Sequence, residues 1–143
     1  MKSVKMHTLE KLENEYWGAP NYPSHLVTTM HQIRTIPLNQ LTTEHLRMAI
    51  GQRMSLQYLI PLAIDKLEEN PLTEGNMYEG DLLFNILTRT PEEYWEQNKG
   101  TTISICDIAK QAEKRLSEKN ELDKDEVDED ILTAVKTFLE IYQ

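Results

Sequence analysis

The stretch that decides the fold is LRMAIGQRMSLQYLIPLAIDKLEENPL, residues 46–72. Its apolar residues recur every three or four positions, the spacing that places side chains on one face of an α-helix. They are Leu46, Ala49, Ile50, Leu56, Leu59, Ile60, Ala63, Ile64 and Leu67. No other part of the sequence is as apolar, so we expect these residues to form the centre of the core.

Two prolines mark the limits of this stretch. Pro61 lacks the amide that would bond the carbonyl of Gln57, which predicts either a kink or a helix that begins near Pro61. Asn70 precedes Pro71 and is therefore driven out of the helical region, so the helix should end there. A loop should follow, and then a helix either capped by Asp81 or entered from Gly80.

The rest of the chain also carries helix signals and no alternating strand pattern longer than four residues. Capping residues are predicted at Thr8, Ser24, Thr42 or Thr43, and Thr90. The helices expected from these caps and from the apolar spacing cover about 8–17, 24–34, 42–50, 91–100, 102–119 and the C-terminal residues from Asp128 or Asp130. The predicted fold is all-α, a single compact domain of about six to eight helices over residues 1–143.

The net charge of the chain indicates which class of partner the protein binds. The 143 residues contain 15 Lys and Arg against 24 Asp and Glu, a net charge of −9. Such a surface repels nucleic acid and anionic lipid and attracts a cationic protein. No apolar run approaches the roughly 18 residues needed to span a bilayer, and acidic residues stand where a signal peptide would be apolar. We therefore expect a cytosolic protein that binds neither nucleic acid nor membranes.

The sequence offers no catalytic constellation. The single cysteine, Cys106, shares a helix face with Ile103 and Ala109 and is predicted to be a buried apolar residue. The acids from Asp123 resemble the start of a calcium loop, but the sixth position is Asp128 instead of glycine and the twelfth is Ala134. No phosphate loop or nucleophile elbow is present. We expect no metal, no cofactor and no catalysis, and hence a binding protein.

Five motifs follow one another along the chain. They are Thr8-Leu9-x-x-Leu12-Glu13-x-x-Tyr16-Trp17-Gly18, Leu41-Thr42-x-Glu44-x-Leu46-Arg47-x-x-Ile50-Gly51-Gln52, Tyr58-Leu59-Ile60-Pro61-Leu62-Ala63, Glu69-Asn70-Pro71-Leu72-x-Glu74-Gly75 and Tyr78-x-Gly80-Asp81-Leu82-Leu83. Together they resemble a family of bacterial contact-dependent growth inhibition (CDI) immunity proteins. The resemblance runs in order from about residue 8 to 95, whereas residues 96–143 match no motif and should add helices around an acidic loop at 118–130.

The resemblance implies a cytosolic protein that binds the C-terminal toxin domain delivered by a neighbouring cell and blocks its active site. Such toxins are commonly nucleases, whose cationic clefts would attract an acidic partner. We expect a monomer in a one-to-one complex. An acidic helical adaptor of another basic protein is an alternative, and an acidic hydrolase with scattered carboxylates also stays open.

Toxin contacts are expected on exposed positions. The acidic candidates lie in the 118–130 region and beside the central turn: Asp123, Asp125, Glu126, Asp128, Glu68, Glu69, Glu74 and Glu79. The aromatic residues Tyr22 and Tyr78 are the candidate anchors, because interface affinity is concentrated in a few buried contacts.

Overall fold

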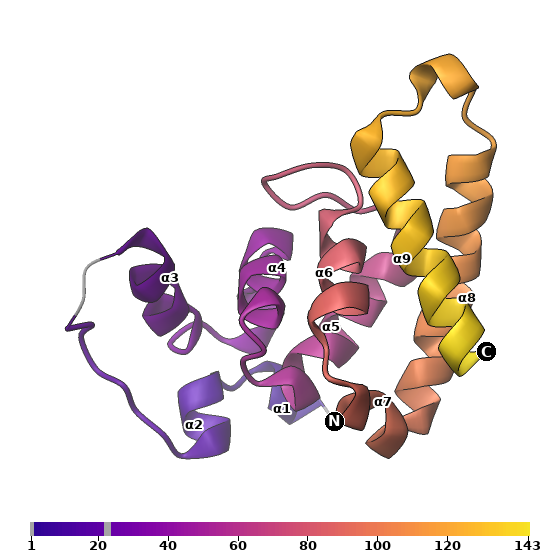
Figure 1. Ribbon diagram of the computed structural model, residues 1–143. Helices are drawn as coiled ribbons and strands as arrows, with labels where there is room; N and C mark the ends of the chain where they lie inside the picture. The colour runs from indigo at the N-terminus through magenta and orange to yellow at the C-terminus, as the bar shows by residue number, and fades with distance from the viewer. Residues whose placement is uncertain (1, 22–23) are drawn as a thin grey trace.

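A computed structural model describes residues 2–21 and 24–143 of the protein. These residues form α-helices and short 3-10 turns and contain no strand, which confirms the all-α prediction. Eight of the α-helices have five residues or more (Figure 1). The elements are α1 (Lys2–Lys5), α2 (Leu9–Glu13), α3 (His25–Ile33), η1 (Leu38–Gln40), α4 (Thr43–Gly51), α5 (Leu56–Glu69), α6 (Asp81–Arg89), α7 (Glu92–Gln97), α8 (Lys99–Ser117), η2 (Glu121–Asp123) and α9 (Glu126–Tyr142).

The predicted core is confirmed. Helices α4, α5 and α6 lie at the centre of the molecule (Figure 1). Of the nine apolar residues predicted to form the centre of the core, eight are buried and Leu56 is half-buried. Helix α5 runs through Pro61, so the expectation of a helix beginning near that residue is wrong. Pro61 and Gln57 both face solvent, where water can satisfy the carbonyl that the proline leaves unpaired. The helix ends at Asn70, as predicted.

The first predicted helix is much shorter than 8–17. Thr8 caps α2 as expected, but Asn14 adopts a left-handed conformation with φ 53° and ends the helix. The buried side chain of Arg34, which is 1% exposed, accounts for the early end of the helix, because it binds the residues on both sides of Asn14. Its guanidinium donates to the Glu13 carboxylate at 2.6 Å and to the Glu15 carbonyl at 2.9 Å. Tyr16, which lies beyond the end of α2, is 64% exposed.

Three other helix starts differ from the sequence prediction. The residue before α7 is Pro91, and the hydroxyl of Thr90 makes no capping bond. Helix α8 already begins at Lys99, so Gly100 lies inside it and does not close the preceding helix. Helix α9 is capped by Asp125 instead of Asp128 or Asp130, because Asp125 forms a reciprocal pair of bonds with the third residue of the helix. Ser24 and Thr42 cap α3 and α4 as predicted.

Helices α8 and α9 form an antiparallel hairpin beside the central helices (Figure 1). Trp95 of α7 packs against the last turns of α9, with its ring centroid 5.0 Å from that of Phe138. Phe138 in turn lies 4.6 Å from the ring of Tyr142. Arg115 of α8 donates to the side chain of Asn70 at 2.8 Å, which ties the hairpin to the end of α5. The hairpin tip and the loop between α5 and α6 lie toward the same end of the molecule (Figure 1).

Burial predicts how much stability each of two leucine substitutions in α5 removes. Leu59 is fully buried in the first turn of α5, so Leu59→Ala should lower the free energy of unfolding by about 2 to 5 kcal/mol, through lost burial and a residual cavity. Chemical denaturation followed by circular dichroism measures this loss. Leu56→Ala, at a half-buried site on the same helix, should cost clearly less. Equal losses at the two sites would contradict the placement of the core.

Candidate functional site

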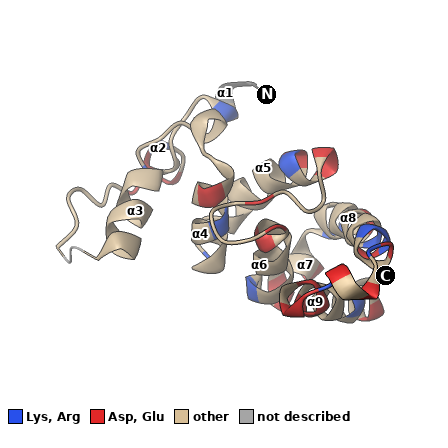
Figure 2. Cartoon of the chain, turned by 90° about the horizontal axis from the view of Figure 1, so that it is seen from above, with Lys and Arg blue, Asp and Glu red and all other residues tan. Residues whose placement is uncertain are grey.

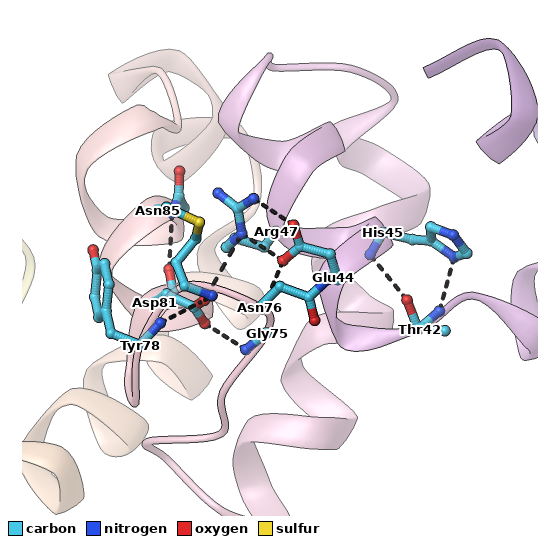
Figure 3. Close-up of polar contacts among 10 residues, drawn as sticks. Thr42, Glu44, His45, Arg47, Gly75, Asn76, Tyr78, Asp81 and Asn85 are labelled. Atoms are coloured by element: carbon cyan, nitrogen blue, oxygen red, sulfur yellow. Dashed lines mark hydrogen bonds and ion pairs between the residues drawn. The ribbon is translucent and has the colours of Figure 1, made fainter. Parts of the chain in front are cut away.

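The loop between α5 and α6, residues 70–80, is held in place chiefly by the side chain of Asp81. Asp81 opens α6 and is fully buried. Its carboxylate accepts hydrogen bonds from the backbone amides of Gly75 at 2.6 Å, Met77 at 3.0 Å and Tyr78 at 3.3 Å (Figure 3). The prediction that the helix is entered from Gly80 is therefore correct, and the Asp81 side chain turns back onto the loop instead of capping its own helix.

Glu44 and Arg47 of α4 complete this polar cluster. Arg47 donates to the two carboxylate oxygens of Glu44 at 2.7 and 2.5 Å, and its Nε lies 3.8 Å from the Asp81 carboxylate. Glu44 also accepts from the backbone amide of Asn76 at 2.9 Å. The hydrogen bonds from Arg47 hold the pKa of Glu44 below its usual range, against the opposing effect of burial. Helix α4 thus binds the loop next to Asp81, and the two carboxylates converge on Gly75 and on Arg47.

Two glycines are required for the loop to approach so closely. A Cβ atom on Gly75 would lie 2.7 Å from the Glu44 carboxylate and 3.1 Å from that of Asp81. Gly80 has φ +90°, and a Cβ atom there would lie 2.6 Å from the side chain of Ile131. A side chain at Gly75 would collide with the polar cluster. A side chain at Gly80 would collide with Ile131 and would also be strained by the positive φ.

A second polar arrangement fixes the start of α4. The hydroxyl of Thr42 accepts from the amide of His45, and the Nδ1 atom of His45 accepts from the amide of Thr42, both at 3.1 Å. Burial lowers the pKa of His45, and the nearby charge of Glu44 opposes that shift only in part. The imidazole is therefore held neutral, as its acceptor role requires.

The C-terminal acids divide into structural and exposed groups. Asp128 is 5% exposed, accepts from the Asp125 amide at 3.3 Å and pairs with the ammonium of Lys119 at 2.9 Å. Asp125 accepts from the Asp128 amide at 2.8 Å and caps α9. Asp128 is consequently not the exposed acid that the sequence predicted, whereas Asp123 and Glu126 are exposed. Figure 2 shows acids gathered around the start of α9 and the turn before it.

One of the central acids, Glu79, acts on Lys119 together with the C-terminal acids Asp125 and Asp128. The hydrogen bond from Lys119 to Asp128 raises the pKa of this lysine, and the charges of Glu79 and Asp125 raise it further. Glu79 of the loop therefore lies close to the hairpin tip. Glu74 is exposed in the same loop, while Glu68 and Glu69 are exposed in the last turn of α5.

Of the two predicted aromatic anchors, Tyr22 and Tyr78, the structure describes only Tyr78. Tyr78 is only half-buried, but its ring packs against Phe84 at a centroid distance of 6.5 Å, so part of it is already engaged. Tyr22 lies outside the described residues. Two apolar side chains that the sequence analysis did not single out are more exposed: Met77 in the loop, at 63%, and Leu122 at the hairpin tip, at 98%.

Glu44 and Arg47 were not predicted to act as a pair. Both stood in the motifs that carried the resemblance, three positions apart and so on one side of a helix. That spacing could have predicted an ion pair. The backbone amides that donate to Glu44 and Asp81, those of Asn76, Gly75 and Met77, could not have been predicted, because almost every residue supplies a backbone amide.

Neither metal chemistry nor thiol chemistry is supported by the arrangement of side chains. Within the described ranges, no group of three or more His, Cys, Asp or Glu side chains is arranged to hold a metal ion. Cys106 is buried, and burial raises the pKa of its thiol, which keeps it protonated. Over the same ranges, no helix combines the length and apolar character that crossing a bilayer requires.

Comparison with known proteins identifies one family. The model of a family described as CDI immunity proteins matches residues 11–105, about two thirds of the chain. The matched region includes α3 to α6, with the Glu44, Arg47 and Asp81 cluster, and ends within α8. No curated protein and no solved structure matches the chain significantly.

The low pKa of His45 predicts a pH-dependent stability. Because the folded protein holds this imidazole neutral, the unfolded chain takes up the proton first as the pH falls. The stabilisation is complete above the unfolded pKa of about 6.5 and is lost as the pH falls through the folded value. In His45→Gln the side-chain oxygen can accept the same Thr42 amide without titrating. Urea denaturation at pH 7.5 and 5.5 should therefore show a smaller loss of stability in this variant than in the wild type; equal losses would exclude His45 as the cause.

Proposed function

The chain belongs to the family of CDI immunity proteins, and we propose that it protects its cell by binding a CDI toxin domain and covering the active site of that domain. The family match is the observation that carries this proposal. It makes the chain an immunity protein, and an immunity protein acts by binding its cognate toxin. The surface used, the nature of the toxin and the mode of inhibition are inferred from the charges and contacts described above.

We infer that the toxin contacts an acidic face formed by the loop and the hairpin tip. We define the acidic face by its exposed carboxylates Glu74, Glu79, Asp123, Asp125 and Glu126. The exposed apolar side chains of Met77 and Leu122 lie in the same two segments and are suited to be anchors. The fixed loop favours binding, since a surface that is already ordered loses little conformational entropy in the complex.

Charge supports a cationic nuclease as the toxin. A nuclease holds phosphates with basic side chains, and a protein of net charge −9 is attracted to such a cleft and can occupy the place of the nucleic acid. In this proposal the protein acts in the cytoplasm as a monomer in a one-to-one complex. It needs neither cofactor nor catalytic residue, because occupying the cleft is sufficient for inhibition.

Electrostatic steering is tested by neutralising the exposed acids without disturbing the helix cap. The triple variant Glu79→Gln, Asp123→Asn and Glu126→Gln spares Asp125 and Asp128, which stabilise the start of α9. It should lower the association rate constant with the inactivated cognate toxin domain by roughly tenfold at low ionic strength. The effect should shrink at physiological ionic strength, where the Debye length is about 8 Å. Stopped-flow kinetics over a salt series measures both quantities.

The matched control changes the same number of charges elsewhere. Glu10→Gln, Glu15→Gln and Asp107→Asn lie on α2, the segment after it and α8, away from the acidic face. Both triple variants change the net charge equally, so only the position of the acids differs between them. Similar rate constants and salt dependences for the two variants would show that the acidic face does not meet the toxin.

A further inference from the structure

A groove runs between α6, α7 and α9, on a part of the surface that the acidic face does not include. Its volume is about 660 Å³, within the range that accommodates several side chains of a bound ligand. Phe84 and Leu87 of α6, Trp95 of α7, and Phe138 and Ile141 of α9 line it. Ile141 is 60% exposed, so apolar surface in the groove is open to solvent.

Both charged residues that line the groove are acidic. Asp130 belongs to the early turns of α9, and Glu92 opens α7 near the other end of α9, where its charge acts on Tyr142. Asp130 and Tyr142 are separated by twelve residues of helix, a rise of about 18 Å. An extended segment of about five or six residues covers that distance. The groove thus presents an apolar floor between two negative ends.

Threonines supply hydrogen-bonding groups along the walls. The hydroxyl of Thr90 is buried and has no partner among the described residues. The hydroxyls of Thr88 and Thr133 donate to helix carbonyls within their own helices, which leaves their lone pairs available to a ligand. A buried polar group without a partner is uncommon in folded proteins, and the backbone of a bound segment could satisfy it.

We propose that this groove receives an extended segment of the toxin domain, in which an apolar or aromatic side chain lies between two basic residues. The inference rests on the proposed function and adds a second contact region to it. Asp130 follows Glu126 by one helical turn, so the groove continues from the acidic face. The charge of the groove favours a basic occupant over a second copy of this chain, whose net charge is −9.

The test fills the groove without removing any of its charges. Thr137 lines the groove, is exposed and lies between Asp130 and Tyr142 on α9. Thr137→Trp should weaken binding of the inactivated cognate toxin domain by about tenfold or more, chiefly through faster dissociation. Thr137→Lys, which places a cation between the two acids, should weaken it as well. Surface plasmon resonance gives both rate constants, and thermal unfolding shows that the variants remain folded.

Gln111→Trp is the matched control, since it adds the same side chain to an exposed position of α8 outside the groove. It should leave the affinity within about twofold of the wild type. If the wild type binds the toxin and the Thr137 variants bind equally well, the groove proposal is overturned while the proposed function stands. If the wild type itself does not bind, both fail. A dimer of the free protein that Thr137→Trp converts to a monomer would assign the groove to a second copy and overturn the proposal.

Discussion

The carboxylate of Asp81 is the group on which the shape of the candidate surface depends. It is fully buried, and a buried charge is tolerated only when it is hydrogen-bonded and paired. Three backbone amides of the 70–80 loop supply the hydrogen bonds, and Arg47 supplies the opposite charge at 3.8 Å. Loss of Asp81 would leave those three amides without their acceptor, whereas Arg47 would keep its hydrogen bonds to Glu44. Asp81 therefore couples the conformation of the loop to the packing of α4 against α6.

This coupling explains how an irregular segment can form part of a binding surface. Glu44 holds the same loop through the Asn76 amide, and Gly75 allows both carboxylates to approach the backbone. Exposed side chains of the loop, Met77 among them, then stand on a backbone that is already ordered. The hairpin tip is fixed independently by the Asp125 and Asp128 capping box and the ion pair with Lys119. Two rigid segments of acidic character thus lie next to each other before any partner binds.

The helices and the core could be predicted from the sequence, because spacing and capping residues act locally. Ser24 and Thr42 cap where expected, and all but one of the apolar residues predicted for the core within 46–72 are buried. Contacts between residues farther apart in the sequence decided two of the differences. The short α2 follows from the buried Arg34, and the role of Asp128 follows from Lys119, nine residues before it. Charge composition predicted acidic surfaces, whereas the groove between α6, α7 and α9 required the packing of distant segments.

Amide hydrogen exchange tests the central claim, that a preformed loop and its neighbouring hairpin tip bind the toxin. The protein is compared alone and in a complex with the inactivated cognate toxin domain. The account predicts that the amides of Gly75, Met77 and Tyr78 are already protected in the free protein, since each is bonded to Asp81. In the complex, protection should increase at residues 72–80 and 118–130 and leave α2 and α3 unchanged. Rapid exchange of the three loop amides in the free protein, or new protection confined to α2 and α3, would contradict it.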